Sequence, residues 1–432
     1  MPHTELIDRH FPRYTDHDPA VPVWCVTPKI GRCLHRFFDT SPIDPSGRLL
    51  AVTRLPFEDR VPGPGDAAEI VVVDLETGSE SVVARTRGWE TQLAANVNWI
   101  GERALVFNDV EPGEWEPFAR RATLAHADRA GWTATLARLD APVYHASHDG
   151  STLASACMKR MRWCQAGYGV VVPEDRIPEN IGVRDDDGLM LTDARSGRVA
   201  RRVSLARFID AAGPDELRSH DARRFHVHGF HAKWSPDDRR LIFTIRWFPA
   251  DGRSVRGLPT MQKPMRFAVY TLRPDGSEIR LAVPPDKWEL GGHHINFFPA
   301  GDRLSMNLGH FAGGALRFCA CRLDGSGLEP LLEHPPGSGH PSVHPTAPRI
   351  LTDAYRHEPV AFDDGSVPLR WVDLRTGDEQ QLARVSVDQP ALSEALRVDP
   401  HPAWDRTWRW VTFNGFVAGT RRVFLADLAS VL

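Results

Sequence analysis

The sequence predicts an all-β fold, a seven-bladed β-propeller, because two short signatures each recur seven times. The first is a run of β-branched and apolar residues that ends in a tight turn, usually after Asp. Its copies are IVVVDLETG (70–78), TLAHADRAG (123–131), LMLTDARSG (189–197), VYTLRPDG (269–276), FCACRLDG (318–325), LRWVDLRTG (369–377) and VFLADL (423–428). The second signature precedes it and joins an aromatic or apolar residue, a Pro/Asp/Gly turn and an apolar strand, as in HAKWSPDDRRLIF and INFFPAGDRLSM. Paired signatures at intervals of about 50 residues indicate antiparallel blades in a ring.

The ends of the chain are expected to meet in one blade. The last blade has two clear strands before Leu432, and an unclosed ring would leave exposed strand edges. We therefore predict that the N-terminal segment 1–34, which contains PVWCVTP, completes the last blade. No linker-like composition interrupts residues 1–432, which predicts a single domain. Two longer intervals, 206–225 and 248–265, are predicted to be a short helix and loops over a face.

Composition excludes several functional classes. Hydrophobic residues make up 42% of the 432 residues and charged residues 25%, as in ordinary globular proteins. The net charge of −4 argues against nucleic acid or an anionic membrane as a partner. The six Cys show no CxxC spacing, which predicts reduced thiols. The N-terminus lacks a basic stretch followed by an apolar one, so we expect a cytoplasmic protein, or a mature form that has lost a leader.

Four histidines occupy one register in four successive blades. Each lies three residues before the aromatic or apolar residue of the second signature: His231 before Trp234, His294 before Phe297, His340 before Val343 and His401 before Trp404. Blade 2 has Asn96 at this position, before Trp99. Because the innermost strands of a propeller begin at its axial channel, equivalent residues of successive blades should converge on one mouth.

This convergence predicts a metal site. A single histidine at such a place is more often a core or turn residue, but neutral imidazoles that meet from rigid strands suit a divalent ion. We predict that the ligands come from the shared register, with Zn, Mn or Ca as the ion: His231, His294, His340 and His401. All-histidine ligation disfavours Ca, which prefers oxygen. Asp399, two residues before His401, is expected to orient that histidine.

Several stretches resemble a known family. They are HRFFDTSP, TQLAANVNW, QAGYGVVVP, HGFHAKW, GGHHINF, GSGHPSVHP and RVDPHPAW. These stretches are similar to the propeller polysaccharide lyases, which include ulvan lyases, rhamnose–glucuronate lyases and, more distantly, oligogalacturonate lyases. The resemblance runs from about residue 32 to the end of the chain. It implies cleavage of a uronate-containing oligo- or polysaccharide, and the oligogalacturonate lyases among these proteins carry a metal on His and Gln in the axial channel.

The resemblance also implies catalytic residues. Ulvan lyases pair a catalytic Tyr with an Arg about sixteen residues later, and Tyr168 and Arg184 have this spacing. The alternative to a catalytic role is that Tyr168 is an aromatic packing residue and that Arg184 is a solvated charge in a loop. Further histidines are expected to supply the partner base, and amides and a histidine to contact the substrate. The candidates are His145, His228 and His35 for the base, and Asn96, Asn98 and His293 for substrate binding.

The expected chemistry explains these residue types. β-Elimination needs a group that neutralises the uronate carboxylate, a base for the C5 proton and an acid for the departing O4. A metal, Arg or amide can serve the first purpose, His or Tyr the second, and Tyr or water the third. The alternative to a lyase is a non-catalytic propeller that binds proteins or glycans. A serine peptidase is disfavoured because no G-x-S-x-G elbow follows the repeats.

Overall fold

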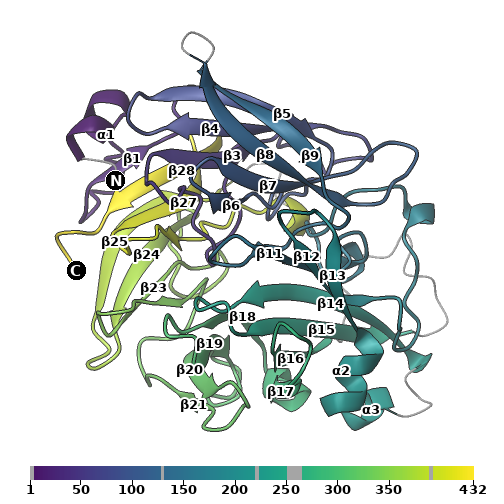
Figure 1. The fold of residues 1–432 in the computed structure, drawn as a ribbon. Coiled ribbons are helices and arrows are strands. Elements are labelled where there is room, and N and C mark those ends of the chain that lie inside the picture. The colour runs from purple at the N-terminus through teal and green to yellow at the C-terminus, as the bar shows by residue number, and fades with distance from the viewer. Residues whose placement is uncertain (1–3, 128–130, 219–222, 251–264, 389–392) are drawn as a thin grey trace.

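The computed structural model describes residues 4–127, 131–218, 223–250, 265–388 and 393–432. They form seven four-stranded antiparallel sheets in a ring, which confirms the predicted seven-bladed propeller (Figure 1). Blade 1 contains β2 (Cys33–Leu34), β3 (Leu49–Arg54), β4 (Ala68–Asp74) and β5 (Ser79–Thr86). Blade 2 contains β6 (Asn98–Gly101), β7 (Ala104–Asp109), β8 (Phe118–Ala127) and β9 (Gly131–Arg138). Blade 3 contains β10 (His145–Ala146), β11 (Thr152–Ser155), β12 (Gly188–Asp193) and β13 (Val199–Ser204).

Blades 4 to 7 follow the same order along the chain. Blade 4 contains β14 (Phe225–Trp234), β15 (Leu241–Pro249), β16 (Arg266–Leu272) and β17 (Arg280–Val283), and blade 5 contains β18 (Gly292–Phe297), β19 (Arg303–Leu308), β20 (Arg317–Arg322) and β21 (Glu329–Pro330). Blade 6 contains β22 (Ser342–Val343), β23 (Arg349–Thr352), β24 (Ser366–Asp373) and β25 (Glu379–Ser386). Blade 7 contains β26 (Ala403–Trp404), β27 (Trp410–Val417), β28 (Thr420–Asp427) and β1 (Val23–Cys25).

The Asp that ends the third strand of blades 1 and 6 stabilises the turn that follows it. Asp74 Oδ1 accepts the backbone N–H of Glu76 at 3.0 Å, and Asp373 Oδ1 accepts that of Arg375 at 2.8 Å. Gly78 and Gly377 close these two turns with φ of 67° and 78°, a conformation that side chains disfavour. The turn chemistry therefore fixes where each third strand ends and its outer strand begins.

The N-terminal strand closes the ring, as predicted. β1 pairs with β28 in antiparallel register, with Val23 opposite Ala426 and Cys25 opposite Phe424. Trp24, between them, is fully buried and packs against Trp410 at 5.9 Å between ring centroids. Because β1 is the outermost strand of a sheet whose other strands come from the C-terminus, both chain ends contribute to one blade (Figure 1).

Helices are few and lie outside the sheets. The α-helices are α1 (Thr4–His10), α2 (Leu205–Ala212) and α3 (Asp215–Arg218), and 3-10 turns cover Arg160–Trp163, Glu174–Arg176, Pro285–Trp288 and Glu394–Leu396. α2 and α3 confirm the short helix predicted within 206–225, whereas most of the 248–265 interval lies outside the described residues. Among the helices that the structure describes, none has the length and apolar character needed to cross a bilayer.

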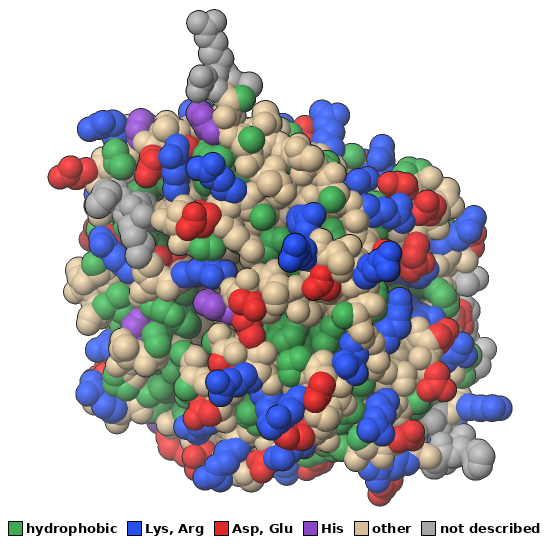
Figure 2. Space-filling model, in the orientation of Figure 1, with side chains coloured by type: hydrophobic (Ala, Val, Ile, Leu, Met, Phe, Trp, Pro, Cys, Tyr) green, Lys and Arg blue, Asp and Glu red, His purple; other side chains and the backbone are tan. Residues whose placement is uncertain are grey.

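Charged side chains of both signs are interspersed over the face shown in Figure 2, as the small net charge suggests. The hydrophobic residues pack mainly between neighbouring blades. The largest cluster spans blades 3 and 4 and includes Phe230, Phe243 and Tyr270. Packing between blades fixes the spacing of the first strands, which carry the candidate site.

We expect Trp24→Ala to destabilise the protein by about 3–5 kcal/mol, because it removes a buried aromatic from the closing strand. Urea unfolding followed by tryptophan fluorescence would measure this change. Val82→Ala, at a side chain that is 47% exposed, is the matched control and should shift the free energy of unfolding little. Equal stability of the two variants would contradict closure by β1 as a main source of stability.

Candidate active site

The register that carries the histidines has an unusual backbone. Asn96, His294 and His401 have φ of 53°, 58° and 51°, in the left-handed region that non-glycine residues adopt rarely. His231 instead lies within the register shift of β14 between Gly229 and Ala232. Left-handed residues and bulges both interrupt regular strand pairing, and such irregular positions are common at functional sites. Three blades thus share a strained backbone at the position that the sequence singled out.

The four histidines predicted as metal ligands surround Phe37. Its ring centroid lies 6.2, 5.9, 5.4 and 4.7 Å from those of His231, His294, His340 and His401, respectively. The rings of His340 and His294 are 3.8 Å apart, and those of His340 and His401 are 4.3 Å apart. The structure therefore brings the four side chains together at the axis. Binding of a metal by them stays a prediction.

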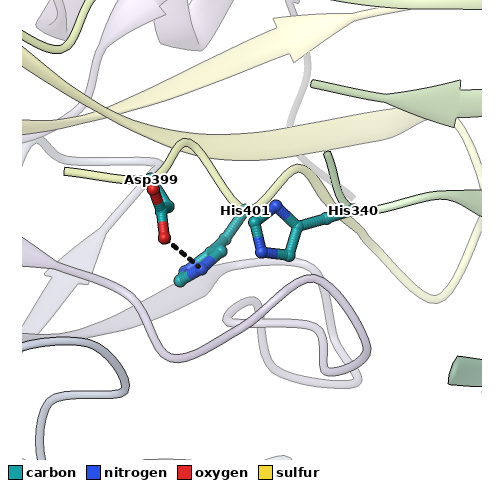
Figure 3. A group of neighbouring side chains, drawn as sticks. All are labelled: His340, Asp399 and His401. Atoms are coloured by element: carbon teal, nitrogen blue, oxygen red, sulfur yellow. Dashed lines mark ion pairs between the residues drawn. The ribbon is translucent and has the colours of Figure 1, made fainter. Parts of the chain in front are cut away.

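His340, His401 and Asp399 form the tightest group (Figure 3). One potential ligand atom from each lies within 4.8 Å of the others, and all three side chains are buried. Within the described part of the chain, Nε2 of His340 and both ring nitrogens of His401 have no hydrogen-bond partner. Asp399 Oδ2 is 3.8 Å from His401 Nε2, too far for the orienting hydrogen bond that we expected. Asp399 is thus better placed as a ligand than as an orienting group.

A large cavity opens beside this group. It has a volume of about 1350 Å³ and is lined by polar, charged and aromatic residues. Those used below are Tyr168, His231, Arg246, His293, His294, Tyr355, Arg397 and Asp399. A smaller pocket of about 400 Å³ is lined by Trp234 and Phe297, at the C-terminal ends of β14 and β18, and by Asn98 of β6. β14 and β18, which carry His231 and His294, therefore reach both the large cavity and the small pocket.

Between the two openings, a buried ion cluster fills the axis. Arg36 and Lys233 both pair with Asp39, and Lys233 Nζ lies 2.8 Å from Asp39 Oδ2. Burial alone would raise the pKa of the Asp39 carboxyl. The charges of Arg36 and Lys233 outweigh this effect of burial and hold the pKa well below its usual range. Lys233 Nζ also lies 5.1 Å from the Phe37 ring centroid. This cluster and Phe37 form the floor beneath the histidines.

Tyr168 lines the large cavity, but Arg184 does not. Arg184 is half-exposed, and its Nε donates to Asp186 Oδ1 at 3.0 Å. The sixteen-residue interval joins two loop positions and so carries no information on the direction of either side chain. The cations near Tyr168 are instead Arg397, 5.8 Å from its ring centroid, and Arg246. The structure gives no geometric support to the predicted pairing of Tyr168 with Arg184.

The three histidines considered as partner bases lie elsewhere. His145 lines the small pocket, and its Nδ1 accepts the backbone N–H of Trp234 at 2.9 Å. His228 is buried in β14 against Phe248, and His35 is buried near Arg36 and His340. Because none of the three lines the large cavity, the structure does not bring them to Tyr168.

Of the three residues predicted to contact the substrate, only His293 lines the large cavity. Asn96 Oδ1 accepts from Arg36 Nε at 3.0 Å, and Asn98 Oδ1 accepts the backbone N–H of Ala146 at 3.2 Å. These two buried amides therefore connect structural elements. His293 does line the large cavity, where its Nε2 is 3.7 Å from Glu358 Oε1.

Sequence reasoning missed three residues of the cavity. Arg397 lies two residues before Asp399, inside the RVDPHPAW stretch, and donates to Asp399 Oδ2 at 2.9 Å. Tyr355 Oη lies 3.0 Å from His294 Nε2, while His294 Nδ1 lies 2.6 Å from the carbonyl oxygen of Gly339. Arg246 comes from the second strand of blade 4, β15. Arg397 could have been found from its motif, but Tyr355 and Arg246 have no local signal.

Comparison with known proteins finds similarity at the level of structure. No family model and no curated protein matches the sequence. An oligogalacturonate lyase in complex with manganese aligns over 96% of this chain and 96% of its own, at a TM-score of 0.56 and 14% identity. Oligogalacturonate lyase from Vibrio parahaemolyticus aligns over 97% and 96%, respectively, at a TM-score of 0.60 and 16% identity. At these identities the likeness shows a common propeller fold, in agreement with the resemblance to propeller lyases.

Mild acid should destabilise the protein. Burial lowers the pKa of His35, His145 and His228 to about 3 in the folded state, whereas an unfolded chain titrates near the ordinary pKa of about 6.5. Between these values the unfolded state binds more protons, so the stability is present above about pH 6.5 and is lost towards about pH 3. At about pH 5 each histidine should cost about 2 kcal/mol.

Urea unfolding of the chelator-treated protein at a series of pH values would measure this loss. His228→Gln should reduce the slope of stability against pH, and His17→Gln, at an exposed side chain, should leave it unchanged. Equal slopes for wild type and His228→Gln would show that His228 does not titrate in this way.

Proposed function

We propose that this protein is a polysaccharide or oligosaccharide lyase that cleaves a uronic-acid-containing glycan by β-elimination, assisted by a divalent metal ion. The observation that carries the proposal is Arg246, a cation in the large cavity that has no carboxylate partner among the residues that the structure describes. The fold shared with oligogalacturonate lyases supports the same class of reaction. Among the described residues, no observation favours the alternative of a non-catalytic scaffold.

Arg246 is a suitable receptor for the sugar carboxylate. Its Nη1 donates to Gln165 Oε1 at 2.8 Å and its guanidinium lies over Phe230, 3.6 Å from the ring centroid. Over the described residues it forms no ion pair, and burial lowers its pKa. A desolvated guanidinium is stabilised by an anion, and its planar fork matches a carboxylate. Binding there would offset the charge that grows on the uronate as the C5 proton leaves.

Two proton transfers complete the reaction, and the cavity offers a group for each. His231 Nε2 is buried and has no hydrogen-bond partner among the described residues, and burial holds the pKa of this imidazole well below its usual range, so the ring is neutral and its Nε2 lone pair is open to the C5 proton. Burial raises the pKa of Tyr168, so its hydroxyl stays protonated and can donate to O4. The C5–H and C4–O4 bonds break and a C4=C5 double bond forms. Tyr168 thus suits the acid role rather than that of the base.

The residues at the axis fit a divalent metal. His340 Nε2 and the His401 nitrogens are buried donors without partners, and Asp399 adds a carboxylate that also lines the cavity. Mixed nitrogen and oxygen donors suit Mn or Zn, whereas Ca prefers oxygen alone. A bound cation would supply a Lewis acid next to the sugar carboxylate.

Arg246→Gln should lower kcat/KM on a uronate glycan by about 10²-fold or more, because it removes the carboxylate receptor. The double bond of the product, conjugated with the carboxylate, is followed by ultraviolet absorbance. Arg184→Gln is the matched control, since this half-exposed arginine pairs with Asp186 outside the cavity, and it should retain activity. Loss with Arg184→Gln alone would restore the pairing with Tyr168. No absorbance change on any uronate glycan would reject the lyase proposal.

Tyr168→Phe removes one hydroxyl and should lower turnover by about 10²-fold or more, as expected for a lost acid. Steady-state kinetics on a substrate that wild type cleaves would measure this effect. Tyr14→Phe also removes a buried hydroxyl, which donates to the carbonyl of Arg384 at 2.8 Å, but outside the cavity. The control should keep wild-type turnover, and a similar result for Tyr168→Phe would exclude Tyr168 as the acid.

Metal removal by a chelator should lower both the melting temperature and activity, and adding Mn²⁺ or Zn²⁺ should restore them. The ion binds the folded state, so a concentration 100-fold above Kd adds about 2.7 kcal/mol of stability. Elemental analysis should find one ion per chain in wild type and none in His340→Ala. His126→Ala, at an exposed histidine of blade 2, should bind the ion normally. A wild type that neither retains nor binds a divalent ion would remove the metal from the proposal.

A further inference from the structure

We infer that Asp353 is the positioning residue that sets the ring orientation of His340 and the backbone of His401, so that their free nitrogens face one point. Asp353 directly follows β23 and is fully buried. It is absent from the large cavity, so it acts through the two histidines and not on a substrate. The inference rests on the proposed function in one respect, that the common point receives a metal ion.

Asp353 determines which nitrogen of His340 is available. His340 Nδ1 lies 2.9 and 3.0 Å from the two carboxylate oxygens of Asp353. A carboxylate accepts hydrogen bonds, so Nδ1 carries the hydrogen and Nε2 keeps its lone pair. Nε2 is buried without a partner and belongs to the group with Asp399 and His401. A carboxylate behind an imidazole is also the arrangement that raises the basicity of a metal-binding nitrogen.

The same carboxylate holds the backbone of two blades. Oδ1 accepts the backbone N–H of His340 at 2.6 Å, and Oδ2 accepts that of His401 at 3.1 Å. His401 has a φ of 51°, which costs free energy in a residue with a side chain, so this hydrogen bond helps to hold it there. Blades 6 and 7 therefore meet at Asp353, and the relative placement of the two imidazoles depends on it.

Gly339 allows this close approach and extends the connection to blade 5. A Cβ at Gly339, where φ is 56°, would lie 2.2 Å from Asp353 Oδ1 and from its carbonyl oxygen, so a side chain is excluded. The carbonyl of Gly339 receives His294 Nδ1 at 2.6 Å and Asn307 Nδ2 at 3.0 Å. Three imidazoles from three blades are thus oriented around Asp353 and Gly339.

The first experiment uses the metal-free wild type. Nitrogen NMR of the imidazole rings should show His340 as the tautomer with hydrogen on Nδ1. Hydrogen on Nε2 would overturn the inference without any variant and without any metal. This readout is independent of lyase activity, so failure of the proposed reaction and failure of the inference are distinguishable.

The second experiment measures Mn²⁺ and Zn²⁺ affinity by calorimetry. Asp353→Asn keeps the size of the side chain but offers a donor where the carboxylate accepts, so it should weaken affinity by about 10- to 100-fold and change the His340 tautomer. Asp74→Asn is the matched control: Asp74 is also fully buried, ends β4 of blade 1 and pairs with Arg48. It should lower stability and leave metal affinity unchanged.

The measurements of metal affinity and of the His340 tautomer each test the inference. Wild-type affinity and an unchanged tautomer in Asp353→Asn would overturn the inference, as would equal loss of affinity in Asp74→Asn, which would indicate a general effect of destabilisation. If Asp353→Asn does not fold, the tautomer in the wild type decides alone. If wild type binds no cation, the metal part of the proposed function is wrong, and the tautomer still tests the positioning.

Discussion

Closure of the ring by β1 is the constraint on which the rest of the structure depends. Seven blades converge on an axis only if the first and last are held side by side, and the pairing of Val23–Cys25 with β28 provides that link. It joins residues about 400 positions apart, a large loop-closure cost that main-chain hydrogen bonds and the burial of Trp24 offset. Once the ring is closed, the positions of all first strands follow, and so does the place where their side chains meet.

The axis is an unfavourable place for charge, and the chain nonetheless buries several charged groups there. Arg36, Asp39 and Lys233 neutralise one another in part at the axis, whereas Arg246, partly buried at the large cavity, has no anion within the described part of the chain. Partial burial of a cation without a partner costs free energy, because the protein interior solvates it poorly. A compensating gain on binding an anionic ligand is a physical reason for retaining such a residue. Buried imidazole nitrogens without hydrogen bonds also cost free energy, and binding a cation would compensate for that cost.

A repeated fold here carries an asymmetric site. The blades share a register, so equivalent residues converge, but their sequences differ at that register, and the site is therefore asymmetric. Blade 2 places Asn96 there as a structural amide, and blades 5 to 7 place imidazoles joined through Gly339 and Asp353. Phe37, from the loop after β2, occupies the centre and separates the histidines from the ion cluster beneath. The fold thus supplies convergence, and local substitutions supply the chemistry.

The sequence by itself determined the propeller, its closure and the meeting of the four register histidines, because the repeated signatures define the blades, the strand missing from the last one and the positions that are equivalent between them. Only the tertiary structure decided which other side chains reach them. Arg184 has the expected spacing from Tyr168 but lies outside the cavity, whereas Arg246, from a different strand of another blade, lies inside it. Asp353 follows an ordinary strand and has no motif. Such contacts join residues far apart in the chain, and a spacing along the sequence does not encode the direction in which loop side chains point.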